Sequence, residues 1–562
     1  MFAPVAAPRK ILPEGVPEYS QNIHRLRHAA ARHERLIPLQ KAQKVLGFTV
    51  IPVILATSMA GAQSPPSQNI PSQTNIPTIT VTSRLVVLDI VVTDKAGNVV
   101  PGLTAKDFTI SEDKTPQNIR SFEGPQQHVL PPNVTINSTA DLAKAPNTPV
   151  SVLVLDELNT RFNDMSFARE SLQKYLQAQP AVLTQPTTLL VVSNTKFEVL
   201  HDYTLDRQAL LTSLKNHFPE YPWQLMKSGK GGPGAAERLA MSLGSLEQVA
   251  QATSGHPGRK NIVWVGPGFP GINTNESTDK EAAVIQQAIQ HIINMMRDAR
   301  ITLSTIDPTI ASSGTVLIET PDDLDAAENE NGSDPFAGDV NFQLLAPATG
   351  GRIYASRNDV DAEIGQSILN GNNYYTLSYS PTNHNDAAQP YRRISIKMNV
   401  PGLTATTRNG YYLQSSAPPV ATTPEAAKQA MNKIAFDLGS AANSTMAYTG
   451  ILVTAQCLPG TPTVFAVSAN TSNLDFESNA DGVSQAEVTV LVASYNRQNK
   501  IIAHQIQEMT ARKKADDASP TADFRVPVTI PAGTTRMRVV VRDTRTGKMG
   551  TADLDPAAFQ KK

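Results

Sequence analysis

The residues between 148 and 372 alternate between short apolar runs and helical patterns, and this alternation limits the possible folds more than any other feature. Residues 150–155 (Val-Ser-Val-Leu-Val-Leu) form a nearly continuous apolar run, typical of a strand covered on both faces. Strands that alternate with helices predict an α/β fold of the Rossmann type, in which a mostly parallel sheet carries helices on both faces. The predicted strands lie at 150–155, 188–192, 261–265, 301–306 and 352–354, and the predicted helices at 164–178, 206–217, 235–253, 279–299 and 358–369.

Two β-rich segments flank this α/β region. Residues 76–123 and 373–413 carry short β-branched runs with period-two alternation. Because each segment alone has too few strands for a stable sheet, we expect the two to pair into one β-sandwich, with the α/β domain of residues 148–372 inserted in it. Residues 437–562 are strand-like again and predict a second, carboxyl-terminal β-sandwich. The Pro-rich stretches 63–75 and 414–436, the latter with a short helix, predict linkers.

The amino terminus has the features of an export signal. Basic residues precede an apolar stretch that ends in Ala60-Gly61-Ala62-Gln63, a small-x-small cleavage pattern. The stretch is about 15 residues long, short of the roughly 20 that cross a bilayer as a helix. We therefore expect residues 1–62 to be a signal peptide region, and the mature chain to be secreted, periplasmic or in the cell envelope. An uncleaved membrane anchor is the alternative.

Composition and motifs argue against several classes of function. A net charge of −1 and a sequence pI near 6.8 give no electrostatic reason to expect a nucleic-acid partner. The glycine-rich loop 229–234 lacks the Gly-Lys-Ser/Thr ending of a phosphate-binding loop, so we expect no nucleotide. The sequence has no nucleophile elbow, no His-Glu-x-x-His helix and no Ser-x-x-Lys followed by its partner motifs. We expect a non-catalytic protein, the alternative being an enzyme whose residues assemble only in space.

Oxygen-bearing side chains follow the first predicted α/β strand. Ligands of open α/β sheets bind beyond the carboxyl ends of the strands, and here Asp156, Asn159 and Thr160 come after the run 150–155. An aspartate followed by small hydroxyl residues is a pattern that suits a hard cation. The segment resembles the metal-ion-dependent adhesion site of von Willebrand factor A (vWA) domains, whose first motif is Asp-x-Ser-x-Ser.

The wider chain is similar to vWA-related domain proteins of the acidobacterial type. The resemblance implies a vWA-like α/β domain with flanking β modules, a secreted or envelope protein, and Mg²⁺ or Ca²⁺ as the ion of the adhesion site. The stretches that carry it are Val91-Val-Thr-Asp-Lys-Ala-Gly-Asn98, Gly102-Leu-Thr-Ala-Lys-Asp-Phe108, Leu155-Asp-Glu-Leu-Asn-Thr160, Thr349-Gly-Gly-Arg352, Tyr374-Tyr-Thr-Leu-Ser-Tyr379 and Arg408-Asn-Gly-Tyr-Tyr412.

The ion site departs from the family pattern. Asp156 matches the first aspartate and Thr160 the second hydroxyl position, but Leu158 stands where a serine ligand belongs, and Asn159 is offset. The threonine of the second motif is missing from 231–234, and Val-Gly-Pro-Gly at 265–268 replaces the Thr-Asp-Gly of the third. The sequence thus predicts a degenerate site. In the alternative interpretation Asp156 caps a turn, and Asn159 and Thr160 cap the first helix.

Protein binding is the function that we expect from these observations. Loops 156–164, 194–204 and 226–235 would lie at the carboxyl edge of the sheet, with Tyr221, Trp223 and Met226 as apolar anchors for a protein partner in the envelope or outside the cell. The alternative for these three side chains is ordinary packing under a long loop. A second hypothesis makes the chain an architectural subunit of an envelope complex, using its β modules.

Overall fold

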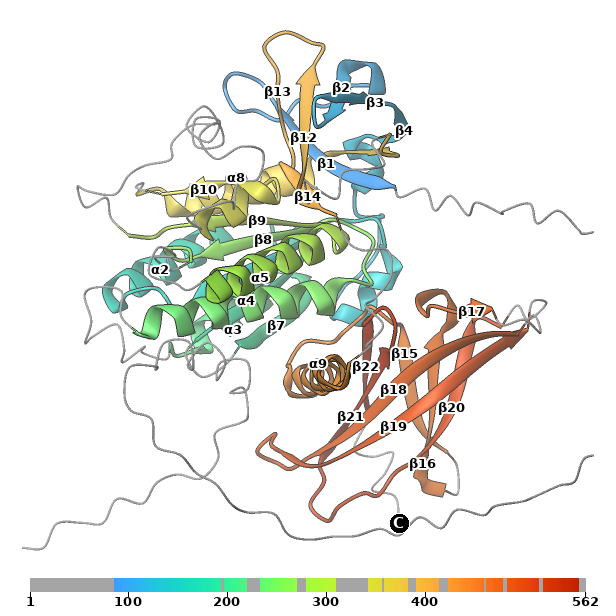
Figure 1. Cartoon of the computed structure of the whole chain (residues 1–562). Helices are drawn as coiled ribbons and strands as arrows, with labels where there is room; N and C mark the ends of the chain where they lie inside the picture. Colours follow the sequence, from blue (N-terminus) through green and yellow to red (C-terminus); the bar gives the residue numbers. More distant parts are fainter. Residues whose placement is uncertain are drawn as a thin grey trace, which may run out of the picture. The chain divides into compact units, whose positions relative to one another are not determined.

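The computed structural model describes residues 85–193, 197–219, 233–269, 279–309, 342–355, 358–382, 391–413, 423–458, 461–478, 483–514 and 519–554. The expected signal region 1–62, the linker 63–75 and the first residues of the amino-terminal β segment lie outside these ranges. Most sheets of the described part are antiparallel, and one sheet of six strands is mixed (Figure 1). No helix within the described ranges is both long enough and apolar enough to cross a bilayer.

The mixed sheet belongs to the α/β domain. Its strands are β5 (Val150–Asp156), β6 (Val182–Val192), β7 (Phe197–Asp206), β8 (Lys260–Val265), β9 (Ile301–Ile306) and β10 (Ile353–Tyr354). Its helices are α2 (Phe162–Ala178), α3 (Arg207–Asn216), α4 (Pro233–Thr253), α5 (Asp279–Asp298), α7 (Leu345–Ala348) and α8 (Val360–Asn372). The strand order is β10-β9-β8-β5-β6-β7, which is the 3-2-1-4-5-6 order of doubly wound α/β folds, counted from the β7 edge.

One edge of this sheet differs from the prediction. Neighbouring strands are parallel from β10 to β6, but β7 pairs with β6 in the antiparallel direction, so the sheet is mixed. The prediction of a loop at 194–204 is therefore wrong for residues 197–204, which belong to β7. Tyr203 and Leu205 of this strand are buried in the core, and that burial favours a strand over a loop.

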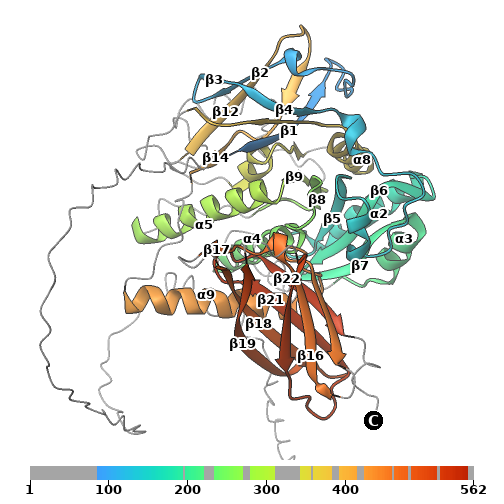
Figure 2. The same cartoon turned by 90° about the vertical axis from the view of Figure 1, so that its right-hand side faces the viewer.

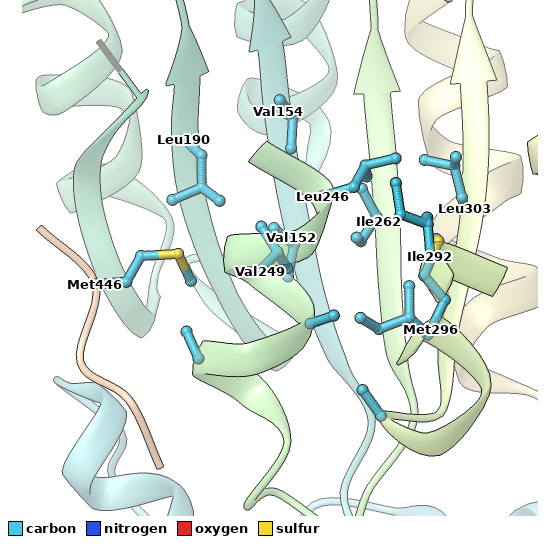
Figure 3. Packing of buried hydrophobic residues seen from close by; sticks show 14 of the residues in the cluster. Val152, Val154, Leu190, Leu246, Val249, Ile262, Ile292, Met296, Leu303 and Met446 are labelled. Carbon is cyan, nitrogen blue, oxygen red and sulfur yellow. The ribbon is translucent and has the colours of Figure 1, made fainter. Parts of the chain in front are cut away.

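Strand β5 is buried on both faces because its side chains alternate between two hydrophobic cores. Val152 and Val154 pack with residues of α4 and α5, such as Leu246 (Figure 3), whereas Leu153 and Leu155 pack with residues of α2, α3 and α8. The sheet is thus covered by helices on both faces (Figure 2), as the apolar run predicted.

The amino-terminal and middle β segments form one sandwich of two four-stranded antiparallel sheets, β13-β1-β11-β4 and β14-β12-β2-β3. Each sheet takes strands from both segments, for example with Leu88 opposite Leu377 (Figure 1, blue beside yellow and orange). The expected pairing of the two segments is confirmed, with the α/β domain between them in the chain. The strands are β1 (Val86–Thr93), β2 (Phe108–Glu112), β3 (Thr115–Gln117), β4 (Ile119–Glu123), β11 (Tyr375–Tyr379), β12 (Tyr391–Met398), β13 (Thr404–Thr406) and β14 (Gly410–Tyr412).

The carboxyl-terminal module contains a second sandwich and one long helix. Helix α9 (Pro424–Asn443) continues past the expected end at 436, because Leu438, Ala441 and Ala442 keep a helical spacing and are buried in the core beside α4. The strands are β15 (Val453–Leu458), β16 (Thr461–Asn470), β17 (Glu477–Ser478), β18 (Val483–Tyr495), β19 (Ile501–Lys514), β20 (Thr521–Pro527), β21 (Arg536–Asp543) and β22 (Met549–Leu554).

The end of α4 lies directly against this module. Thr449 donates to the backbone oxygen of Ala252 from its backbone N (2.9 Å) and from its Oγ1 (2.8 Å). A Cβ on Gly255 would lie 1.7 Å from the backbone oxygen of Thr449, so only glycine allows this approach.

Candidate functional site

The carboxyl end of β5 lies at the topological switch point of the mixed sheet. Strands β5 and β8 are adjacent there, and the chain leaves them toward opposite faces, which is where open α/β sheets bind their ligands. Asp156 is the last residue of β5 and is fully buried. The register pairs Val154 with Trp264, so the indole of β8 lies beside the end of β5.

Both oxygens of Asp156 accept hydrogen bonds. Oδ1 accepts from the backbone N of Leu158 (3.0 Å) and of Asn159 (2.9 Å). Oδ2 accepts from Asn159 Nδ2 and from Trp264 Nε1, each at 2.9 Å. A carboxylate offers about four lone-pair positions, so these donors use all of its acceptor capacity.

The surroundings of Asp156 are tightly closed. Asn159 Nδ2 also donates to Ser242 Oγ on α4 (3.0 Å), which ties the loop after β5 to that helix. A Cβ on Gly266, at the position of the family's third motif, would lie 2.5 Å from Asp156 Cβ. The ring of Trp264 contacts Phe269, with centroids 5.3 Å apart. The switch point is therefore filled by side chains and backbone.

Burial sets the electrostatics of this position. Desolvation raises the pKa of Asp156 to about 6, although the hydrogen bonds from Asn159 and Trp264 oppose it. Burial also lowers the pKa of Arg238 on α4, and the charge of Asp156 opposes this shift.

The predicted metal ligands come together, but their geometry does not fit a divalent cation. A cation would compete with four N–H donors for the oxygens of Asp156, and the side chain of Leu158 packs in the core. Asn159 Oδ1 and Thr160 Oγ1 are buried without hydrogen-bond partners, which leaves two oxygens where Mg²⁺ prefers six. No group of three His, Cys, Asp or Glu side chains suited to a metal occurs among the described residues.

The capping alternative is correct in part. Asp156 caps the turn after β5 through the backbone N–H groups of Leu158 and Asn159. Neither Asn159 nor Thr160 caps the first helix, since its N-cap residue is Arg161 and no side-chain capping bond forms there.

A second group of polar contacts lies beside this loop. The side chain of Glu157 is 1% exposed, and its Oε1 lies 2.7 Å from His217 Nε2, at the end of α3. Arg169 of α2 donates from Nη2 to the backbone oxygens of Leu214 (2.8 Å) and His217 (2.9 Å). Phe218, the residue after His217 in the chain, is 84% exposed. A hollow of about 340 Å³ adjoins it, lined by Met165, Ser166, Arg169, Glu170, Gln173, Leu214 and Pro219.

The three predicted partner-binding residues, Tyr221, Trp223 and Met226, lie outside the described residues. Sequence reasoning missed Trp264, Arg238 and Phe218. A signal for Trp264 exists, because adjacency of the first and fourth strands places its indole beside Asp156. No comparable signal marks Arg238 or Phe218.

No protein-family model matches the chain, and no curated protein matches it in sequence. Among solved structures, an aerotolerance-related membrane protein from Bacteroides fragilis shares 12% identity, covering 39% of this chain and 98% of that one, with a TM-score of 0.23. Proximal thread matrix protein 1 from the mussel byssus shares 9% identity, covering 42% and 47%, with a TM-score of 0.23. The SpRpn10 VWA domain shares 13% identity, covering 29% and 89%, with a TM-score of 0.17.

Proposed function

We propose that this chain is an exported, vWA-like protein-binding protein that holds its partner without a metal ion and without catalysis. The observation that carries the proposal is Phe218, an aromatic side chain left 84% exposed at the corner of the sheet where α/β folds bind their ligands. Aromatic side chains are enriched at protein interfaces, because one of them buries a large apolar area.

The support beneath Phe218 favours a binding role. Arg169 and the contact between His217 and Glu157 fix the backbone just before this residue. A side chain held by a rigid support loses less conformational entropy when a partner covers it. The neighbouring hollow would accept a side chain of the partner.

The state of Asp156 supports binding without a metal. A metal-bridged contact needs an acceptor oxygen that can turn toward an ion, and four N–H donors already occupy the oxygens of this carboxylate. The partner is therefore expected to contact the surface formed by side chains around Phe218.

The architectural role is a second candidate, favoured by strand β19. This strand of 14 residues pairs with β18 along one edge. Two of its isoleucines are exposed, Ile502 to 40% and Ile506 to 50%. A complex built through the carboxyl-terminal module would cover these two side chains.

Site-specific photocrosslinking tests both candidates. A benzoyl-bearing phenylalanine replaces Phe218 in one variant of the full chain, Ile506 in a second and Val284, 57% exposed on α5, in a control. We expect a discrete protein adduct in the producing cells from position 218 alone, unchanged by a metal chelator. An adduct from position 506 alone would favour the architectural role, and one that a chelator abolishes would overturn binding without a metal.

The adduct identifies the partner for a binding measurement. With the purified partner, Phe218→Ser should weaken binding about tenfold or more, the loss expected when an interface anchor is removed. Val284→Ser is the matched control and should bind as the unsubstituted chain does. Equal affinity of both variants would contradict a role for Phe218.

A further inference from the structure

A small cavity lies where the α/β domain meets the first sandwich. Its lining comes from β8, β9, α8 and the Gly350-Gly351 turn of the α/β domain, and from Val91 and Thr406 of the sandwich. The space open to the centre of a water-sized sphere is about 10 Å³, room for one small molecule or ion. Gly351 is fixed by this packing, because a Cβ there would lie 1.7 Å from the backbone oxygen of Leu303.

Two buried polar atoms on the lining residues have no hydrogen-bond partner. They are Nη1 of Arg259 and Oγ of Ser367, on side chains that are 2% and 3% exposed. Arg259 uses its Nε to donate to Thr302 Oγ1 (3.0 Å), and its guanidinium stacks 5.0 Å from the ring centre of Tyr374. Buried donors are rarely left unpaired in proteins, so these two atoms indicate a missing acceptor.

The charge around the cavity is unbalanced. Arg259 and Arg352 both line it, and no carboxylate is among the lining residues. The carboxylate of Asp89 is paired with Arg300, which donates from Nε (3.2 Å) and Nη2 (2.5 Å), so Arg259 shares the charge of Asp89 with a closer arginine. Arg408 is also buried within electrostatic reach of Asp89.

A further buried amine belongs to Lys260, which does not line the cavity. Lys260 is 1% exposed, and its Nζ donates to the backbone oxygens of His256 (2.6 Å) and Gly258 (3.1 Å) rather than to a carboxylate. Burial lowers its pKa to about 7, helped by the charge of Arg300. The positive charge at the cavity is therefore that of Arg259 and Arg352, and a negative charge there would stabilise the buried guanidinium of Arg259.

We propose that this cavity binds a small monovalent inorganic anion of the halide class, held by the Arg259 guanidinium and the Ser367 hydroxyl. Water would accept the same two hydrogen bonds, but it would leave the positive charges unbalanced. Sulfate and phosphate are larger than the available space. Because both the sandwich and the α/β domain contribute lining residues, the anion would strengthen the contact between them.

Halide dependence of stability is the first test. Thermal unfolding of the full chain is compared at equal ionic strength in chloride, bromide and gluconate, the last being too large for the cavity. Chloride and bromide should raise the melting temperature by about 2–4 °C when present at about a hundredfold over their dissociation constants. Equal melting temperatures in the three salts would overturn the proposal.

Matched variants locate the site. Ser367→Ala should raise the halide concentration for half-maximal stabilisation about tenfold, since it removes one hydrogen bond to a charged group. Ser245→Ala is the control, because Ser245 is equally buried but bonds to Met241 within α4. Crystals grown in bromide should show an anomalous peak beside Arg259, and a cavity without that peak would mean that water is the occupant.

Discussion

Asp156→Ala removes the acceptor shared by four N–H groups at the end of β5. Three of them, the backbone N of Leu158, the backbone N of Asn159 and Trp264 Nε1, have no other hydrogen bond in this cluster. The fourth, Asn159 Nδ2, keeps its bond to Ser242 Oγ. The substitution therefore leaves three buried donors unpaired in a closed environment.

The expected cost follows from these donors. A buried donor without an acceptor costs about 1–3 kcal/mol, so three cost roughly 3–9 kcal/mol. Water that enters the space vacated by the carboxylate reduces this, as does relief of the desolvation that raises the pKa of Asp156. We expect a loss of about 3–5 kcal/mol in the free energy of unfolding at pH 7.

Trp264 provides the assay. The chain has 2 tryptophans, so a Trp223→Phe background leaves Trp264 as the only one, directly bonded to Asp156. Urea unfolding of the full chain, followed by its fluorescence, gives the free energy of the α/β transition. Asp94→Ala is the control: Asp94 caps a turn by a similar set of bonds, but at the surface, and its removal should cost less. A loss below about 1 kcal/mol for Asp156→Ala would refute the reasoning.

Three further predictions concern buried charge. Trp264 fluorescence should titrate with a midpoint near pH 6, the pKa of Asp156, and not do so in Asp156→Asn. Because that pKa is raised on folding, the protein should lose stability as the pH rises from about 4 to about 6. Its unfolding free energy should fall by about 3 kcal/mol more than that of Asp156→Asn over this range, and a rise would contradict the prediction. Burial lowers the pKa of His256 to about 4. Its neutral form therefore stabilises the fold above about pH 6.5, and this stabilisation is lost as the pH falls toward 4. In urea titrations, the unfolding free energy of His256→Gln should fall less steeply with decreasing pH than that of the unsubstituted chain. Arg542→Met should lower the free energy of unfolding in urea by about 3 kcal/mol, because Asp437 is then buried with Lys433 as its one remaining cation among the described residues. Adding Asp437→Leu should restore part of the lost stability. A double variant less stable than Arg542→Met would contradict this prediction.

Much of the fold follows from patterns within the sequence. The apolar run 150–155 predicted β5, and the helical pattern at 206–217 predicted α3, which begins one residue later because Asp206 caps it through the backbone N of Gln208. Strand β7 was missed because polar His201 interrupts the period-two series of Phe197, Val199 and Tyr203, and apolar Leu200 lies out of phase with it.

The candidate site was harder to predict because its contacts are distant in the chain. Asp156 and Trp264 are 108 residues apart, and whether the carboxylate faces a cation or an indole N–H depends on the register of β5 and β8. The composition of the loop after β5 is compatible with both outcomes. Exposure of Phe218 likewise depends on how α2 supports the end of α3, which no local pattern specifies.

The position of the α/β domain in the chain determines when the strands of the first sandwich can pair during synthesis. Asp89 and Thr376 bond across strands that are 287 residues apart, so β1–β4 are synthesised long before β11–β14 exist to pair with them. Closing a loop of this length costs about 5 kcal/mol of chain entropy, and an α/β domain that folds first shortens the loop that remains. We expect strands β1–β4 to keep unpaired edges until the α/β domain, which separates them from β11–β14 in the chain, has been synthesised.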